Sequence, residues 1–231
     1  MIYRTVLNHV ILLFGVFIML SPILLIFFSS SQSTSDLRTS GMQFEFGNHL
    51  VQNYNSVLNF ESGFTDEITP MGMLSNSLII AIGVGVLTTL LSFFTAYSIV
   101  FFKYKSANII FWLVLSTLLF PLEARFIPTF QIASYLGLIN THLGIILPVI
   151  AAALGTFFFR QYFLSLPEEL LEAALLDGAG SFKFALDILI PLSLSRAAAI
   201  FIIAFMIGWN QYLWPIMIST DDTLYTLVRG I

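Results

Sequence analysis

Long apolar runs, separated by short polar gaps, dominate the amino-acid sequence. The run at residues 9–28 is apolar over about 20 residues, enough for a helix to cross about 30 Å of hydrocarbon. Charged residues are confined to the gaps between such runs, so a lipid bilayer is the expected solvent. We therefore predict an all-α, polytopic transmembrane helical bundle, with spans at residues 9–28, 73–102, 107–128, 143–160 and 197–218.

The first run has a second interpretation, as a secretory signal peptide, because Arg4 precedes it and Ser29 to Ser31 follow it. Its apolar stretch is longer than the usual about 7–15 residues, and no A-x-A cleavage site follows. We interpret it as an uncleaved membrane anchor.

The composition agrees with a membrane protein and excludes several kinds of functional site. Hydrophobic residues make up 58% and charged residues 10% of the chain, against about 45–50% and about 25% in soluble domains. Cysteine is absent, which excludes disulfides, thiol catalysis and cysteine-bound metals. The three histidines, His9, His49 and His142, show no metal-ligand spacing. We expect no metal, no cofactor and no nucleic-acid partner.

Basic residues predict the orientation, because lysine and arginine are retained on the cytoplasmic side of short loops. With a cytoplasmic N-terminus, the inner segments hold Arg4, Lys103, Lys105, Arg160, Lys183 and Arg196, and the outer segments hold only Arg38, Arg125 and Arg229. The predicted segments outside the spans are a cytoplasmic N-terminus (1–8), a periplasmic loop (29–72), a cytoplasmic loop (161–195) and a periplasmic tail (219–231).

The cytoplasmic loop is expected to form two short helices joined by a tight turn. Ser165 can cap the first helix, with Pro167 in its first turn and Glu168 in the capping-box position. Gly178 supplies the left-handed residue that ends this helix. A second helix is predicted from near Ser181 to Pro191. An apolar stripe runs along the first helix at Leu170, Leu171, Ala174 and Leu175.

A motif with fixed spacing crosses this loop. Glu172-Ala173-Ala174, then Gly178, then Ile188-Leu189-Ile190-Pro191 resembles the E-A-A-x3-G-x9-I-x-L-P motif of binding-protein-dependent ABC importer permeases, with Ile190 in the place of leucine. The resemblance implies that the loop docks into a cleft of a separate ATPase, with Glu172 as the polar anchor. The residues that it assigns to coupling are Glu172, Ala173, Ala174, Asp177, Gly178, Ala179, Ile188 and Pro191. From the apolar stripe alone, a helix lying on the bilayer surface is the alternative.

The resemblance extends from about Ser75 onward to carbohydrate-importer permeases of the maltose type. The stretches Phe120 to Pro128 and Gly208 to Pro215 look closest to the second permease subunits of glycerol-3-phosphate importers. The implied assembly is a type I ABC importer in the bacterial inner membrane, with a second permease subunit in a heterodimer, an ATP-binding cassette ATPase dimer and a periplasmic solute-binding protein. Such permeases have six spans, so five predict a missing sixth span or a sequence truncated at its C-terminal end.

Polar residues in the fifth predicted span are candidates for the translocation pathway, because a polar side chain at that depth is costly unless it faces a cavity. These residues are Trp209, Asn210, Gln211 and Tyr212. The alternative is an aromatic belt at the outer interface, and both interpretations fit Trp214. Near the outer end of the third span, Glu123 and Arg125 are also candidates. Arg125 can offer positive charge to a phosphate-bearing solute, or extend to lipid headgroups instead.

Catalysis by this chain is not expected. No G-x-x-x-x-G-K-[ST] loop occurs, so another chain must bind ATP, and neither H-E-x-x-H nor G-x-S-x-G is present. The predicted function is therefore half of a translocation pathway for a sugar or polyol phosphate such as glycerol-3-phosphate. The alternatives are a permease for neutral oligosaccharides and a non-transporting scaffold or sensor subunit.

Overall fold

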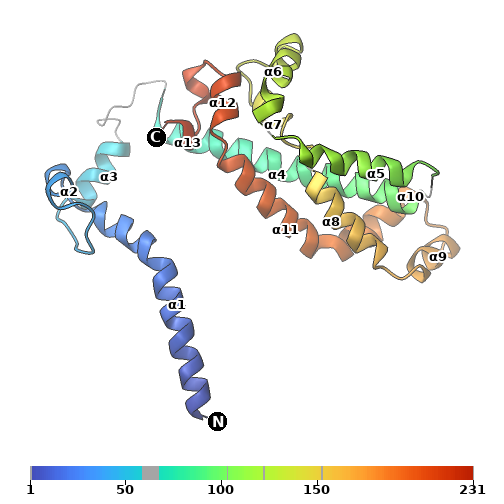
Figure 1. Ribbon diagram of the computed structural model, residues 1–231, viewed down its shortest axis with the longest axis horizontal. Helices are drawn as coiled ribbons and strands as arrows, with labels where there is room; N and C mark the ends of the chain where they lie inside the picture. The colour runs from blue at the N-terminus through green and yellow to red at the C-terminus, as the bar shows by residue number, and fades with distance from the viewer. Residues whose placement is uncertain (1, 59–67, 103, 122, 152, 231) are drawn as a thin grey trace. The chain divides into compact units, whose positions relative to one another are not determined.

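The computed structural model describes residues 2–58, 68–102, 104–121, 123–151 and 153–230. Its regular structure over these ranges is helical throughout, which confirms the all-α prediction. The chain divides into two compact units, Met1–Asp66 and Glu67–Ile231 (Figure 1). Three of the described helices are long and apolar enough to cross a membrane, namely Tyr3–Ser29, Pro70–Phe101 and Ser181–Trp209, and a shorter apolar helix covers Ala107–Leu119.

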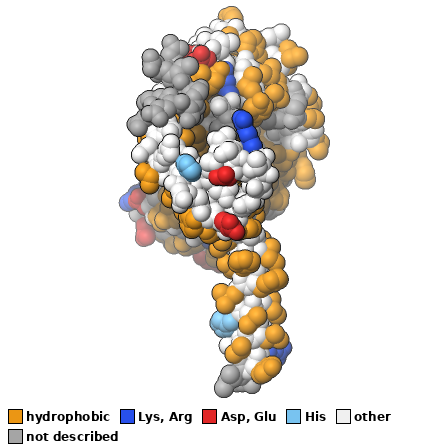
Figure 2. Space-filling model, turned by 90° about the vertical axis from the view of Figure 1, so that its left-hand side faces the viewer, with side chains coloured by type: hydrophobic (Ala, Val, Ile, Leu, Met, Phe, Trp, Pro, Cys, Tyr) orange, Lys and Arg blue, Asp and Glu red, His pale blue; other side chains and the backbone are white. Residues whose placement is uncertain are grey.

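The first unit contains one long helix followed by two short ones. Helix α1 (Ile2–Ser29) has a stretch with mean hydropathy 2.9 that buries none of its residues within the structure. Figure 2 shows hydrophobic side chains over its visible face. Helices α2 (Thr34–Ser40) and α3 (Leu50–Leu58) follow. A helix that is apolar and exposed all round fits lipid as its solvent, in agreement with the predicted first span.

Helix α4 (Pro70–Phe101) is the central element of the second unit and packs against α8 (Ala153–Leu164) and α11 (Ile190–Trp209). It begins where the hydroxyl of Thr69 accepts a bond from the amide of Gly72, with Pro70 in the first turn. Small residues allow close packing with α11. A Cβ atom added at Gly208 would lie 3.0 Å from the Cα of Ala81 and from the Cβ of Val84.

The predicted third and fourth spans are each divided among shorter helices. The third comprises α5 (Ala107–Ser116), η1 (Thr117–Leu119), η2 (Glu123–Arg125) and the start of α6 (Phe126–Tyr135). The fourth comprises α7 (His142–Ile146) and α8. The helical segments end just before Pro121 and Pro148. Proline has no amide hydrogen, and its ring clashes with the preceding turn of a helix.

The second loop helix does not end at Pro191 as predicted. Helix α10 (Ser181–Phe184) continues through a π-helical turn, η3 (Ala185–Leu189), directly into α11. The wider turn just before Pro191 places the proline in the first turn of α11, where its missing amide hydrogen costs little. The helix then ends at Trp209, within the predicted fifth span. Helix α12 (Leu213–Ile218), η4 (Asp222–Leu224) and α13 (Leu227–Gly230) follow.

Two buried clusters lie along α4 and α11. Cluster A joins the ends of these helices to the predicted coupling loop and contains Phe93, Ala96, Tyr97, Phe159, Phe163, Ala174, Phe184, Ala185, Leu189 and Ile200. Cluster B joins them to α6, α7 and α12 and contains Ile80, Val84, Phe126, Ala133, Ile145, Ile146, Ala204, Trp214 and Ile218.

Candidate functional site

The E-A-A segment lies on the short helix α9 (Glu169–Leu176), and its two alanines have different environments. Ala174 is 4% exposed and belongs to cluster A, with Phe184 of α10. It is the buried residue of α9. Glu172 and Ala173 are exposed. One alanine therefore seats α9 on the transmembrane helices, and its neighbour belongs to the outer face.

The turn after α9 is a Schellman motif. Gly178 has φ +73°, its amide donates to Leu175 O over 3.1 Å, and the amide of Ala179 donates to Ala174 O over 2.9 Å. These two bonds pair carbonyls that a helix end leaves free. Asp177 is the C-cap and is exposed. The predicted helix end at Gly178 is confirmed.

The start of α9 differs from the prediction. Ser165 does not cap α9, because its hydroxyl donates to Tyr162 O of α8 over 2.7 Å. The amide of Leu166 likewise donates to Phe163 O, so these residues complete α8 before α9 begins. Glu168 is the N-cap of α9 and makes no side-chain cap bond.

Two tyrosine hydroxyls connect the loop to the long helices. Tyr97 of α4 donates to Ser181 O at the start of α10 over 2.7 Å. Tyr162 of α8 donates to Leu192 O of α11 over 2.8 Å, and the guanidinium of Arg196 lies over the same ring, 4.2 Å from its centroid. Neither bond was predicted, since nothing local in the sequence indicates the partner of a tyrosine hydroxyl.

Ile188 and Pro191 lie on the continuous helix and not on α9. Ile188 is half-buried and packs against cluster A, whereas Pro191 is exposed in the first turn of α11. Of the eight residues that the motif assigns to coupling, these two therefore lie on the transmembrane side of the loop.

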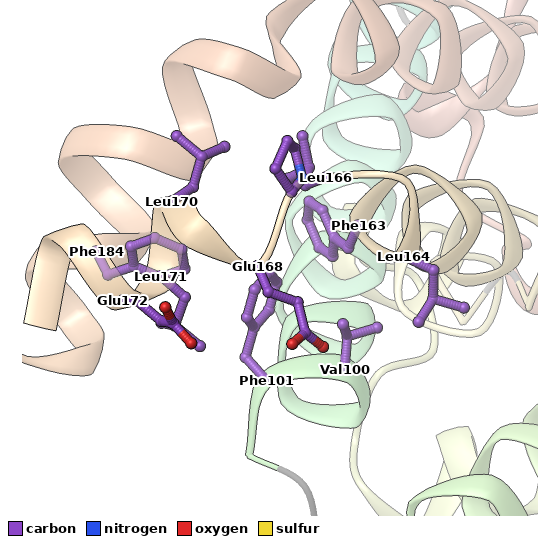
Figure 3. Close-up of a pocket in the computed structure, with 11 residues that line it drawn as sticks. Val100, Phe101, Phe163, Leu164, Leu166, Glu168, Leu170, Leu171, Glu172 and Phe184 are labelled. Carbon is purple, nitrogen blue, oxygen red and sulfur yellow. The ribbon is translucent and has the colours of Figure 1, made fainter.

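A cavity of about 210 Å³ lies between α9 and the ends of α4 and α8 (Figure 3). Phe101, Phe163 and Phe184 contribute to its apolar lining. Glu168 and Glu172, one helical turn apart, also line it. Among the described residues, no basic side chain lines the cavity with them. Two exposed carboxylates therefore give this cavity a negatively charged rim.

The predicted pathway residues lie at the break between α11 and α12. The side-chain amide of Asn210 donates to Met206 O over 2.8 Å, so it caps its own helix. Trp209 stacks on Phe205 with ring centroids 5.9 Å apart, and Tyr212 is 54% exposed. Both polar atoms of the Gln211 side chain are buried without a hydrogen-bond partner in the described structure. Gln211 thus has buried hydrogen-bonding groups that are unused in the described structure.

Trp214 lies in the core of the second unit. It is 3% exposed, its indole donates to Gly144 O over 3.1 Å, and its ring stacks on Phe126 at 5.8 Å. Arg125 and Trp214 line a small cavity of about 40 Å³. The Nε of Arg125 is buried and has no hydrogen-bond partner among the described residues. The side chain of Glu123 lies outside the described part of the structure.

Sequence reasoning missed a polar clasp centred on Asn76. Its amide nitrogen donates to Thr223 O over 2.7 Å and to Tyr225 O over 3.0 Å, and its oxygen lies 2.9 Å from His142 Nε2. Asn76 is 7% exposed and ties the segment after α12 to α4. An asparagine inside an apolar run was the available signal.

Known proteins resemble this chain over most of its length. Residues 68–230 match the model of the family described as binding-protein-dependent transport system inner membrane component. The sn-glycerol-3-phosphate transport system permease protein UgpE of Yersinia pestis bv. Antiqua (strain Antiqua) is 42% identical over 224 residues, which cover 96% of this chain and 79% of the relative. The UgpE protein of Rhizobium meliloti (strain 1021) is 39% identical over 227 residues, covering 97% and 79%.

A solved structure shares the fold. The crystal structure of a bacterial ABC transporter involved in the import of the acidic polysaccharide alginate matches with a TM-score of 0.78 and 24% identity, covering 98% of this chain and 78% of that chain. The family match and the apolar helices agree on a multi-pass protein of the bacterial inner membrane. This chain belongs to the family of binding-protein-dependent transport system inner membrane components, the permease subunits of ABC importers.

Proposed function

We propose that the chain forms half of the translocation pathway for glycerol-3-phosphate or a closely similar polyol phosphate. The observation that carries this proposal is the 42% identity, over 96% of the chain, to permeases named for sn-glycerol-3-phosphate transport. The other half of the pathway would come from a second permease subunit, and a periplasmic solute-binding protein would deliver the solute.

ATP hydrolysis would take place on a separate ATPase dimer that docks on α9. Support comes from the exposed Glu172, Ala173 and Asp177, which form an acidic outer face beside a small residue. A basic groove on the ATPase would complement this face, and the small side chain of Ala173 would permit close contact. Desolvated opposite charges in such a contact fix register and orientation.

Movement of α9 would reach the bilayer through contacts within cluster A. Ala174 seats α9 on this cluster, the Schellman turn joins α9 to α10, and α10 continues without interruption into α11. A displacement of α9 would therefore move α10 and α11 together as one rigid helix. The bond from Tyr97 to Ser181 O would connect the same displacement to α4.

Solute recognition would use the unpaired polar groups near the break after α11. Arg125 carries a positive charge and a buried, unpartnered Nε beside a small cavity, which suits a phosphate oxygen. Gln211 has an unpartnered amide that suits hydroxyl groups of a polyol. Trp209 and Tyr212 would provide apolar contact, while Asn210 and Glu123 complete the candidate set.

The proposal is tested by reconstitution of the permease with the products of its neighbouring genes in proteoliposomes. We expect ATP-dependent uptake of radiolabelled glycerol-3-phosphate and stimulation of ATP hydrolysis by the loaded binding protein. Uptake of neutral oligosaccharides in its place would contradict the solute assignment. An intact assembly that transports neither class would favour a scaffold or sensor subunit.

A further inference from the structure

Helix α3, in the first unit, carries an apolar stripe that nothing in the described structure covers. Its nine residues contain no charged side chain, and none of the nine is buried. Val51, Tyr54 and Leu58 are 71%, 50% and 57% exposed. On a helix wheel the apolar side chains share one face, consisting of Leu50, Val51, Tyr54, Val57 and Leu58, and Gln52 lies on the opposite face.

The orientation of this stripe is fixed by hydrogen bonds to the end of α1. The side-chain amide of Asn53 donates to Ser30 O over 2.9 Å and to Gln32 O over 2.8 Å. The backbone amide of His49 donates to Ser31 O over 2.9 Å. Helix α3 is therefore held at the level where the long apolar helix ends, with its stripe in a defined direction.

Apolar side chains from the end of α1 and from α3 line one groove. Phe27, near the end of α1, lines an open groove of about 380 Å³ together with Leu50, Val51, Tyr54 and Asn55 of α3. The ring of Phe46 packs on Phe27 at 5.8 Å and on Phe28 at 4.5 Å.

Residues 43–47 extend this surface beside α3. Phe44 and Phe46 are 55% and 61% exposed. Hydrogen bonds hold the segment along the end of α1, from Gln32 Nε2 to Glu45 O and from the Gly47 amide to Ser31 Oγ. Its aromatic side chains therefore lie at the same level as the end of the apolar helix.

We propose that the apolar face of α3, with Phe44 and Phe46, lies in the interfacial zone of the bilayer, in the leaflet at the C-terminal end of α1. An amphipathic helix of this kind lies parallel to the membrane with its apolar face among the upper acyl chains. Continuity with α1, which exposes apolar side chains on all sides, identifies lipid as the occupant. Tyr54 and the phenylalanines suit the interface, where aromatic side chains are enriched. This helix would anchor the loop and limit the tilt of α1.

The experiment uses the absence of cysteine from the chain, which allows single-cysteine labelling of the complete importer in lipid nanodiscs. Val51→Cys reports on the apolar face and Gln52→Cys, its neighbour, is the matched control. Each variant carries an environment-sensitive fluorophore. Quenching is measured with phospholipids brominated near the headgroup and, separately, with iodide in the aqueous phase.

We expect lipid quenching to be several-fold stronger for the label at residue 51 than at residue 52, and iodide quenching to show the reverse order. Leu58→Cys is a second probe of the apolar face and should behave like residue 51. Equal access of iodide to residues 51 and 52 would overturn the proposal. Protection of residues 51 and 58 from both quenchers would also overturn it, because a protein partner would then cover the stripe.

Discussion

At the scale of single residues, two neighbouring alanines of the E-A-A segment have separate roles. Ala174 faces cluster A and is 4% exposed, whereas Ala173 is exposed on the outer face of α9. The spacing of the motif does not distinguish the direction of the two side chains, because both positions require a small residue. Their separation into an inward and an outward residue depends on how α9 is seated on α10 and α11.

Enlarging each alanine should separate folding from docking. Ala174→Leu inserts extra volume into a packed cluster and should cost about 1–3 kcal/mol, lowering the melting temperature of the purified permease. Ala173→Leu should change stability by less than about 0.5 kcal/mol but obstruct the ATPase. Thermal unfolding and co-purification with the ATPase measure the two effects. Equal destabilisation by both variants would contradict the assigned directions.

Gly178 and Gly180 form a matched pair for testing the turn. A Cβ would meet no atom within 4 Å at either residue, but only Gly178 has a positive φ, +73°. Gly178→Ala should therefore lower stability by about 1 kcal/mol through backbone strain alone. Gly180→Ala should be close to neutral. Thermal unfolding of both variants checks this, and a similar melting temperature for the two would argue against the Schellman turn.

At the scale of elements, the sequence predicts helix type better than helix ends. The apolar runs identify α1 and α4 because length and composition suffice for a spanning helix. The continuity of α10 with α11 was not predictable, because Pro191 normally ends a helix and the π-helical turn that accommodates it depends on packing. The Asn76 clasp was missed for the same reason, since its partners are 147 and 149 residues away.

Removing the Asn76 clasp should release the segment after α12. Asn76→Leu leaves the carbonyl groups of Thr223 and Tyr225 without their donor, at a cost of about 1–3 kcal/mol in local stability. Faster amide hydrogen exchange across residues 222–230 is the expected readout. Thr95→Val is the control, because the Thr95 hydroxyl donates to Leu91 O within α4 itself. Unchanged exchange in the Asn76 variant would show that other contacts hold the segment.

At the scale of the whole second unit, α4 and α11 pass through both buried clusters. Cluster A lies at the E-A-A loop, and cluster B contains Trp214 and Phe126, next to the Arg125 cavity. The same two rigid helices therefore connect the proposed ATPase contact to the proposed solute contact. Because the two sites share helices but no residues, changes at one site can be separated experimentally from changes at the other.

Arg125→Gln should impair the transport of charged solutes without affecting assembly. Loss of a charge-assisted hydrogen bond to phosphate, about 1.5–3 kcal/mol, should reduce uptake of glycerol-3-phosphate about 10-fold to 100-fold at limiting solute. Uptake of any neutral polyol that the importer accepts should change little, and co-purification with the ATPase should persist. Arg38→Gln, an exposed arginine of the first unit, is the control for loss of charge. Equal losses for phosphorylated and neutral solutes would instead assign Arg125 a structural role beside Trp214, because a purely structural defect does not distinguish solutes by charge.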